Sequence, residues 1–334
     1  MKRAIFLCEL SDKFEAVFPE RLVEEIKKSV DTDGVLYGKK DILSSPEAFS
    51  DVSFIFSTWG MPTFTEAEIE KAFPALECVF YAAGTVQAFA RPFLARGVKV
   101  FSAWAANAVP VAEYTVAEIL LAGKCFYTQT RLMAEKKSEE AYALREACIG
   151  NYGEKVGLIG CGMIGSLVAE ALKVYDLEVL VYDPFLSDEK AEALGVKKAS
   201  LDEIFSTARV VSNHLANNPQ TQGILGYEHF SRMLPYSTFI NTGRGAQVRE
   251  DELIKLLSLR PDVTAVLDVT SREPLPESSP LYTLNNCFLT PHIAGSLGGE
   301  VVRMAKYMLT ECRAFLSGEK THYEVTAKML ETMA

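Results

Sequence analysis

The chain has 334 residues, which is enough for two domains that each bury a core of their own. Hydrophobic residues make up 49% of it and charged residues 23%, the normal range for a globular protein. The formal net charge of −10, with no basic stripe for phosphates, argues against a nucleic-acid-binding protein. With four histidines and seven scattered cysteines, the sequence also gives little scope for a metal site.

Cysteine usage and the apolar segments predict a soluble, cytoplasmic protein. The cysteines are odd in number and form no Cys-x-x-Cys motif, which favours reduced, buried thiols over a disulfide framework. The apolar run that follows Met1 ends at Glu9, so it is too short for a signal peptide. The longest apolar stretch, residues 109–123, is interrupted by Glu113 and Glu118, so we expect no membrane span.

Short apolar segments alternate with amphipathic ones in the first hundred residues. We expect strands at residues 4–7, 34–36, 52–56, 78–81 and 99–101. We expect helices at residues 14–28, 66–73 and 86–95. This alternation is typical of βαβ units and predicts a parallel sheet with helices on both faces.

A second series of the same kind follows a long helical pattern. That pattern runs from about Val109 to Leu144 and is too long for a simple crossover, so we expect one helix that bridges two domains. The next strands are expected at residues 155–159, 178–182, 209–213, 238–241, 264–268 and 287–290. Six strands with intervening helices match one dinucleotide-binding sheet. A last helix, at about residues 299–316, remains to pack elsewhere.

A glycine-rich turn joins the first strand of this second series to a helix. Gly160 allows the tight turn, Gly162 lets the backbone approach a pyrophosphate, and Gly165 permits close packing of helix on strand. The amides of Met163 and Ile164, at the start of the new helix, are expected to face the phosphate charge. A lone Gly-x-Gly-x-x-Gly is a weak motif, but its place between a strand and a helix strengthens it.

Asp183 indicates which cofactor the turn accepts. It stands at the end of the next strand, about 20 residues after the glycines, where the fingerprint requires an acidic residue. A carboxylate there accepts hydrogen bonds from the ribose 2′-hydroxyl group and repels a 2′-phosphate, so NAD is favoured over NADP. The following Pro184 and Phe185 offer no arginine for a 2′-phosphate. The alternative is that Asp183-Pro184 is an ordinary turn.

Four further strands of the second series end in polar groups. These endings are Asn213-His214, Asn241-Thr242-Gly243-Arg244-Gly245, Asp268 and Thr290-Pro291-His292. In open α/β sheets ligands bind beyond the carboxyl ends of the strands, so four such endings together predict a shared cleft.

Hydride transfer to a keto acid requires groups that these endings, and the loop that follows Asp268, can supply. Arg244 can bind the carboxylate and polarise the carbonyl, His292 can protonate the oxygen, and Glu273 can orient the imidazole. Each has an ordinary alternative: a surface cation between turn glycines, a helix cap or core histidine, and a solvated loop charge. His214 is expected to support the cofactor cleft, or to be a purely structural histidine.

The sequence resembles the D-isomer-specific 2-hydroxyacid dehydrogenase family. Four segments carry the resemblance, in the family's order: residues 157–165, 240–245, 267–274 and 289–295. It covers residues 98–299 well and the rest more weakly. It implies an α/β fold of two Rossmann-like domains with doubly wound parallel sheets. An NAD-binding domain, residues 106–295, would be inserted into a substrate-binding domain formed by residues 1–105 and 296–334.

The resemblance also implies roles for individual residues. Arg244 would bind the substrate, His292 would be the acid/base and Glu273 its partner, while Asp268 would hold the nicotinamide carboxamide. Further residues would lie along the cofactor: His214, Leu215, Ala216, Thr221, Thr242 and Gly243. Ala83 and Gly84 would offer backbone amides to the substrate carboxylate. The helix that starts near Val109 is similar to the one through which family members form homodimers.

Some positions depart from the family pattern. Ala216 stands where a proline is frequent, and the loop of residues 83–87 lacks the acidic residue that many relatives carry. Trp59 and Trp104 can line an apolar substrate pocket or belong to the core.

We therefore expect an NAD-dependent oxidoreductase that interconverts a small 2-keto acid and the D-2-hydroxy acid, with domain closure around the substrate. Two alternatives are a non-catalytic NAD(H)-sensing binding protein of the same fold and another Rossmann enzyme, such as an aldehyde reductase. No metal is expected to take part.

Overall fold

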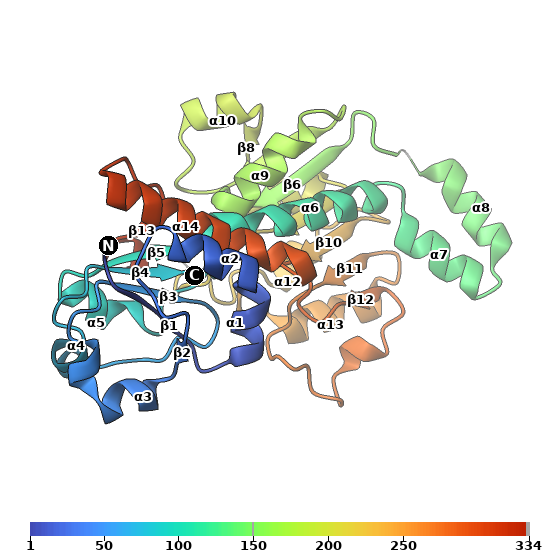
Figure 1. The fold of residues 1–334 in the computed structure, drawn as a ribbon. Helices are drawn as coiled ribbons and strands as arrows, with labels where there is room; N and C mark the ends of the chain where they lie inside the picture. Colours follow the sequence, from blue (N-terminus) through green and yellow to red (C-terminus); the bar gives the residue numbers. More distant parts are fainter. Residues whose placement is uncertain (149, 332–334) are drawn as a thin grey trace. The chain divides into compact units, whose positions relative to one another are not determined.

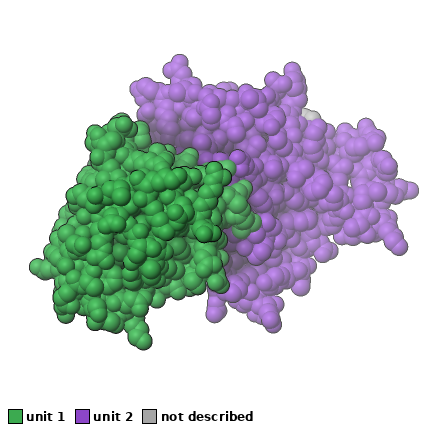
Figure 2. Space-filling model, viewed as in Figure 1, with its two compact units in different colours: residues 1–107, 296–334 green, residues 108–295 purple. Residues whose placement is uncertain are grey.

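The computed structural model describes residues 1–148 and 150–331. The chain forms two compact units (Figure 2). Unit 1 consists of Met1–Asn107 and Ser296–Ala334, and unit 2 is Ala108–Gly295. Unit 2 is thus inserted into the chain of unit 1, which is completed only when the C-terminal segment returns.

Unit 1 is built on a six-stranded sheet in the order β13-β5-β4-β3-β1-β2 (Figure 1). Its strands are β1 (Ala4–Leu7), β2 (Leu36–Tyr37), β3 (Phe54–Ser57), β4 (Cys78–Tyr81), β5 (Lys99–Ser102) and β13 (Glu324–Val325). All neighbours pair in parallel except β13, which is antiparallel to β5. Its helices are α1 (Ser11–Val17), α2 (Glu20–Lys27), α3 (Lys39–Ser44), α4 (Glu66–Ala72), α5 (Ala90–Ala95) and α14 (Val301–Ser317). Three short 3-10 turns complete it, at Pro46–Phe49, Gly298–Glu300 and Met329–Glu331.

Two apolar clusters cover the two faces of this sheet. Side chains alternate along β1, so Ala4 and Phe6 enter one cluster while Ile5 and Leu7 enter the other. The first cluster includes residues of α1, α2 and α14, and the second includes residues of α4 and α5. Helices on both faces of a parallel sheet give the doubly wound arrangement that the sequence predicts.

Unit 2 carries a seven-stranded parallel sheet in the order β12-β11-β10-β9-β6-β7-β8. Its strands are β6 (Lys155–Ile159), β7 (Glu178–Tyr182), β8 (Lys197–Lys198), β9 (Val210–Asn213), β10 (Thr238–Asn241), β11 (Thr264–Leu267) and β12 (Cys287–Leu289). Its helices are α7 (Phe126–Ala134), α8 (Ser138–Ala147), α9 (Met163–Leu172), α10 (Asp188–Leu194), α11 (Leu201–Thr207), α12 (Tyr227–Phe230) and α13 (Glu250–Leu259). Two 3-10 turns lie at Gly245–Gln247 and Pro280–Tyr282, and α6 (Trp104–Ala122) leads in from unit 1.

The strand order of unit 2 reverses at β6. The chain proceeds from β6 to β7 and β8 on one side, then crosses to β9, β10, β11 and β12 on the other. Ligands of doubly wound sheets bind at the carboxyl ends of the strands at such a switch point. The turn after β6 and the loop after β9 therefore mark the expected binding site, and the predicted fold class is confirmed.

Two predicted helices are wrong because the chain bends inside them. The segment expected to be one helix at residues 14–28 is divided into α1 and α2 at Pro19, which lacks the N–H group that a continuing helix needs. The single helix expected from Val109 is three helices, α6, α7 and α8. Cys125 (φ 51°) and Lys136 (φ 61°) adopt left-handed backbone conformations at the two breaks.

Other differences concern short elements. The two-residue strands β8 and β13 were not predicted, because two residues show no periodicity that a sequence can reveal. The predicted strand at residues 34–36 lies at Leu36–Tyr37, and the helix expected from residue 86 begins at Ala90. Within the described residues, no helix is long and apolar enough to cross a membrane.

Candidate functional site

The glycine turn after β6 has the geometry that dinucleotide binding requires. Gly160 has a φ of +95°, and a Cβ atom there would lie 2.8 Å from the backbone of His214. A Cβ at Gly165 would lie 2.1 Å from the carbonyl oxygen of Gly160, so α9 packs directly on the turn. At Gly162, by contrast, a Cβ would meet nothing within 4 Å. A side chain would therefore not fit at Gly160 or Gly165, whereas the space at Gly162, where the pyrophosphate is expected, is open.

Asp183, at the end of β7, is hydrogen-bonded to this turn. Its Oδ2 accepts the backbone N–H of Cys161 at 2.6 Å, and its Oδ1 accepts that of Phe185 at 2.8 Å. The side chain of Lys190, on α10, donates to the carbonyl oxygen of Cys161 at 2.9 Å. The carboxylate is therefore fixed beside the glycines, and its role in ribose binding stays a prediction. Lys190 is a cation at the turn that the sequence did not reveal.

His214 follows β9 and is buried beside the same turn. Its Nε2 lies 3.0 Å from the hydroxyl of Ser212, and its Nδ1 lies 3.5 Å from the hydroxyl of Thr242. Burial lowers the pKa of His214 to about 4, so the ring is neutral at neutral pH. A neutral, buried imidazole fits a supporting role in the cofactor cleft and not that of a proton donor.

Arg244 lies in the loop after β10, between two glycines with little free space. A Cβ at Gly243 would lie 2.9 Å from polar atoms of Asn213 and Gln247, and one at Gly245 would lie 1.9 Å from the backbone of Thr270. The guanidinium donates to the carbonyl oxygen of Gly243 at 2.7 Å. Among the described residues no carboxylate forms an ion pair with it, so its charge is available to an anionic ligand.

His292 and Glu273 form an ion pair at the surface of unit 2. The Nδ1 atom of His292 lies 2.8 Å from Oε2 of Glu273, and the two side chains are 47% and 41% exposed. A carboxylate at Nδ1 orients the ring and leaves Nε2 to face a substrate. The structure thus brings together two of the three residues assigned to the chemistry.

Asp268, after β11, holds the segment on which His292 lies. Its carboxylate accepts hydrogen bonds from the hydroxyl of Thr290 (2.6 Å) and from the backbone N–H groups of Ile293 (2.7 Å) and Ala294 (2.9 Å). His292 has a φ of +56°, which is unfavourable for a residue with a side chain. Asp268, which is 2% exposed, stabilises that conformation. Asp268 therefore positions His292 independently of any ligand that its carboxylate binds.

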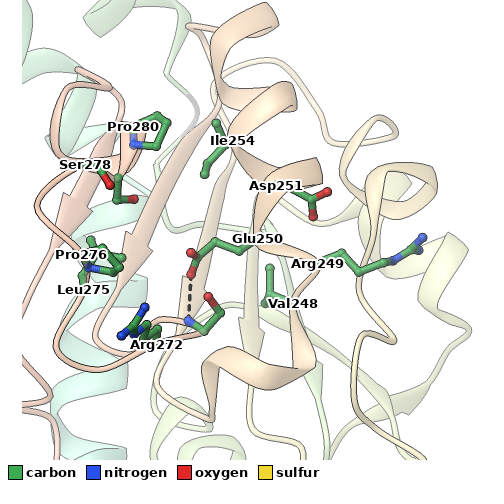
Figure 3. Close-up of a pocket in the computed structure, with 12 residues that line it drawn as sticks. Val248, Arg249, Glu250, Asp251, Ile254, Arg272, Leu275, Pro276, Ser278 and Pro280 are labelled. Carbon is green, nitrogen blue, oxygen red and sulfur yellow. Dashed lines mark hydrogen bonds between the residues drawn. The ribbon is translucent and has the colours of Figure 1, made fainter.

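The loops that carry Arg244 and Glu273 are in direct contact. Gly245 packs on the backbone of Thr270 and Ser271, and the carboxylate of Glu250, at the start of α13, accepts the N–H of Ser271 at 2.8 Å (Figure 3). A hollow of about 580 Å³ lies beside this bond. It is lined by residues 248–251, 254, 271–272, 275–276 and 278–280, none of which is a predicted site residue.

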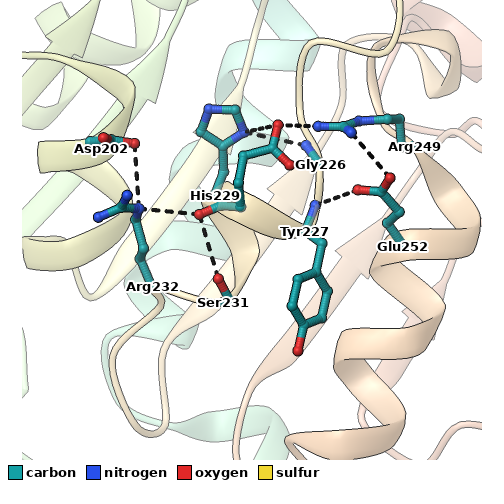
Figure 4. A network of polar contacts seen from close by, with 9 residues as sticks. Asp202, Gly226, Tyr227, His229, Ser231, Arg232, Arg249 and Glu252 are labelled. Carbon is teal, nitrogen blue, oxygen red and sulfur yellow. Dashed lines mark hydrogen bonds and ion pairs between the residues drawn. The ribbon is translucent and has the colours of Figure 1, made fainter.

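A network of charged side chains connects α12 to α13, the helix that follows the loop of Arg244 (Figure 4). Arg249 pairs with Glu228 and, at 3.1 Å, with Glu252, whose carboxylate also accepts the N–H of Tyr227 at 2.6 Å. These contacts join α12 to the beginning of α13.

Three other residues predicted to contact the cofactor lie in the loop after β9. The N–H group of Leu215 donates to Oδ1 of Asn213 at 3.3 Å, and the hydroxyl of Thr221 donates to the carbonyl oxygen of Ala216 at 2.6 Å. Thr242, after β10, lies 3.2 Å from the hydroxyl of Thr115. Sequence reasoning did not identify Gln247, although its side chain contacts both the loop after β9 and the loop after β10. Within residues 1–148 and 150–331 no cluster of metal-ligating side chains occurs.

The three predicted substrate residues of unit 1 lie at the ends of β3 and β4. The hydroxyl of Ser102 donates to the carbonyl oxygens of Ala83 (2.9 Å) and Gly84 (2.5 Å), which fixes that loop. A Cβ at Gly84 would meet nothing within 4 Å. Trp59 is partly buried against both apolar clusters of the unit, so its place in a substrate pocket stays a prediction.

Solved structures share this fold over nearly the whole chain. A phosphoglycerate oxidoreductase from Rhizobium etli has a TM-score of 0.82 at 20% identity, covering 99% of this chain and 100% of its own. The apo form of D-mandelate dehydrogenase from Rhodotorula graminis has a TM-score of 0.78 at 18% identity, covering 97% and 98%. At these identities the likeness shows the fold alone.

Curated relatives are similar at the level of sequence. The D-3-phosphoglycerate dehydrogenase of Archaeoglobus fulgidus is 32% identical over 222 residues, and that of Mycobacterium bovis is 30% identical over 261. These matches cover 63% and 77% of this chain but only 42% and 48% of those proteins. The glyoxylate reductase of Korarchaeum cryptofilum is 29% identical over 256 residues, which are 76% of this chain and 77% of that one.

A family model matches the part of the chain that carries the glycine turn, Arg244, Glu273 and His292. Residues 119–294 match "D-isomer specific 2-hydroxyacid dehydrogenase, NAD binding domain". The matched range is more than half of the chain and coincides with most of unit 2. NAD is thus the cofactor that the fold and the open glycine turn fit. This chain belongs to the D-isomer specific 2-hydroxyacid dehydrogenase family.

Proposed function

We propose that the protein is an NAD-dependent dehydrogenase that interconverts a small 2-keto acid and the corresponding D-2-hydroxy acid. The observation that carries this proposal is the His292–Glu273 pair, 2.8 Å apart, on a unit that also presents Arg244, with which no carboxylate among the described residues pairs. An oriented acid/base and an available guanidinium are the groups that reduction of a keto acid needs from the protein.

The reductive reaction follows from these residues. The guanidinium fork of Arg244 binds the substrate carboxylate and polarises the 2-carbonyl group. NADH, when bound, supplies the hydride that C2 accepts. As the carbonyl π bond breaks, protonated His292 gives its proton to the oxygen and becomes neutral. Glu273 accepts a hydrogen bond from Nδ1 throughout, which keeps Nε2 directed at the substrate.

The cofactor is proposed to lie along the carboxyl ends of the strands of unit 2. The amides of Met163 and Ile164 would face its pyrophosphate at Gly162, and Asp183 would accept the ribose hydroxyls. The carboxamide of the nicotinamide would be held at Asp268. The other residues proposed to line the cofactor are Gly160, Gly165, His214, Leu215, Ala216, Thr221, Thr242 and Gly243.

Unit 1 is proposed to bind the rest of the substrate, with the backbone amides of Ala83 and Gly84 on the carboxylate and Trp59 beside the side chain. The carbonyl groups of Ala83 and Gly84 are engaged by Ser102, which supports the orientation this role requires. D-stereochemistry is proposed from the family to which the chain belongs.

The experiment that tests the proposal is NADH oxidation with a panel of 2-keto acids graded by side-chain size. The panel runs from glyoxylate and pyruvate to 2-ketoisocaproate and phenylpyruvate, and includes 3-phosphohydroxypyruvate. We expect turnover with at least one member, a D-configured product, and loss of turnover in Arg244→Ala. Measurable NADH binding without turnover across the panel would contradict the proposal and favour the cofactor-sensing alternative. Turnover of aldehydes that lack a carboxylate, independent of Arg244, would favour another class of reductase.

We also propose a homodimer formed through α6 and the helices that follow it. Leu121, Phe126, Met133 and Tyr142 are between 39% and 54% exposed on α6, α7 and α8, an apolar set that a second copy would cover. All seven cysteines are free thiols, which supports the proposed cytoplasmic location. Sedimentation equilibrium of the wild type and of Met133→Glu tests the dimer.

A further inference from the structure

Three buried amide side chains meet where β9 and β10 end. Asn213, Asn241 and Gln247 are 0%, 1% and 0% exposed. The Nδ2 atom of Asn213 donates to Oδ1 of Asn241 at 3.0 Å and to Oε1 of Gln247 at 2.6 Å. Buried amides are stable only when they are hydrogen-bonded, so these three form one connected unit.

The amides hold the backbone of Arg244 from both sides. Its N–H group donates to Oε1 of Gln247 at 3.1 Å, and its carbonyl oxygen accepts from Nδ2 of Asn241 at 3.3 Å. A backbone N–H requires an acceptor, so this contact fixes which end of the Gln247 amide is oxygen. The position of the guanidinium therefore depends on two side chains that no substrate reaches.

The same amides hold Leu215 in the loop after β9. Its N–H group donates to Oδ1 of Asn213 at 3.3 Å, and its carbonyl oxygen accepts from Nε2 of Gln247 at 2.6 Å. Gln247 is thus bonded to both loops at once. The fit is tight, because a Cβ at Gly243 would lie 2.9 Å from both Asn213 Nδ2 and Gln247 Oε1.

We infer that Gln247 is a positioning residue that couples Arg244 to the cofactor loop at Leu215. Gln247 contacts neither substrate nor cofactor, since it is fully buried. It acts by fixing the backbone from which the guanidinium extends, together with the loop proposed to line the cofactor. The inference rests on the proposed function, in which Arg244 binds the substrate carboxylate.

The principal variant is Gln247→Met, which keeps the length of the side chain and removes its polar atoms. It leaves the N–H of Arg244 and the carbonyl of Leu215 without their partner. We expect kcat/KM for the keto acid to fall by about tenfold to 100-fold, mainly through KM, since small misplacements of a binding group have effects of this size. Gln247→Glu keeps the oxygen that accepts from Arg244 and Asn213 but sets a carboxylate oxygen against the carbonyl of Leu215, so its defect should fall on the loop after β9 and on NADH binding more than on the keto-acid KM.

A double variant removes the amide pair as a whole. Asn213→Leu with Gln247→Met removes both partners of the buried bond, but it also takes the acceptor from the N–H of Leu215, so its stability should fall at least as far as that of the single variant. The KM defect should persist, because the N–H of Arg244 still lacks its acceptor. Gln129→Met, the same substitution on α7 away from the strand ends, is the matched control.

Each protein is compared by its thermal midpoint, its NADH dissociation constant, and its affinity for oxamate in the presence of NADH. Oxamate has the carboxylate and carbonyl of a keto acid but resists reduction, so its binding reports on Arg244 without turnover. Weaker oxamate binding in Gln247→Met and in the double variant, with normal binding in Gln129→Met, supports the inference. Wild-type KM and oxamate affinity in the folded double variant would overturn it. Absence of turnover in the wild type would instead count against the proposed function.

Discussion

Two regions of unit 2 carry polar residues assigned to function, and they differ in how those residues are held. At the ends of β9 and β10, the amides of Asn213, Asn241 and Gln247 are at most 1% exposed and bond to one another and to the backbone. At the His292–Glu273 pair the side chains are 47% and 41% exposed and their ion pair is a single contact. One region is a buried frame, and the other is an accessible pair placed beside it.

Substitutions in the two regions are therefore expected to change different measured quantities. A buried polar group that loses its partner raises the free energy of the folded state, so substitutions in the frame should lower stability. An exposed ion pair contributes little to stability because water screens it, so substitutions in the pair should change the reaction and leave the fold intact.

The largest effect is expected for His292→Ala. Loss of a general acid lowers turnover by about 100-fold to 10,000-fold. Because the ring is exposed, the thermal midpoint and the NADH dissociation constant should remain those of the wild type. Steady-state kinetics and thermal unfolding measured on one preparation check both statements. His322→Ala, an exposed histidine of unit 1, is the control, and near-normal turnover of the His292 variant would disprove its role.

His214 should show the opposite behaviour, a contribution to stability that depends on pH. Burial lowers its pKa from 6.5 to about 4, so below pH 6.5 the unfolded chain takes up a proton that the folded chain does not. Stability is therefore greatest above pH 6.5 and falls as the pH drops towards 4, by up to about 3 kcal/mol. The lowered pKa of the partly buried His229 acts in the same direction.

Urea unfolding of the wild type and of His214→Gln across this pH range measures the effect. The variant should be less stable near neutral pH, where its ring contacts are lost, but its stability should decline less steeply in acid. Parallel pH dependences for the two proteins would contradict the assignment of the decline to His214.

Arg244→Lys tests whether the geometry of the guanidinium matters beyond its charge. A lysine keeps the positive charge but cannot bind a carboxylate with two parallel hydrogen bonds. We expect a loss of about tenfold in kcat/KM for the keto acid, carried by KM, with NADH affinity unchanged. Wild-type kinetics would show that only charge is required.

The smallest effect is expected for Glu250→Ala, which removes the hydrogen bond to Ser271 two residues before Glu273. Loosening this loop should lower kcat by a few-fold, about the loss of one ordinary hydrogen bond. Glu250→Gln retains an acceptor and should restore most of it. Asp251→Ala removes the same charge from the same turn of α13 and is the matched control. Equal losses in Glu250→Ala and Asp251→Ala would show that helix charge, not the Ser271 contact, is responsible.

The central elements of the sheets were predictable from sequence because burial on both faces leaves continuous apolar runs. The predicted bounds of β1, β4, β6, β7 and β10 are those observed. The helix expected from Val109 failed because no glycine or proline marks the turn at Lys136, where a lysine adopts the left-handed conformation. Pro19 did mark the break between α1 and α2, and the prediction of one helix at residues 14–28 did not take it into account.

The residues of the candidate site also divide into those that the sequence reveals and those that it does not. Residues that must be glycine, such as Gly160 and Gly165, are visible in sequence because their spacing is fixed by the turn they make. Gln247 is not visible, because its role depends on Asn213 and Leu215, more than thirty residues away in the chain, and on a 3-10 turn without periodicity. Strand-end polarity revealed Asn213 and Asn241 but not the partner that joins them.

The most direct test of the account is to follow deuterium from NADH that carries two deuterium atoms at C4 of the nicotinamide. With the keto acid that turns over fastest, we predict one deuterium at C2 of a D-2-hydroxy acid, formed by the wild type and strongly reduced in His292→Ala. Product without deuterium at C2, or label transferred at equal rates by the two proteins, would contradict hydride transfer assisted by His292.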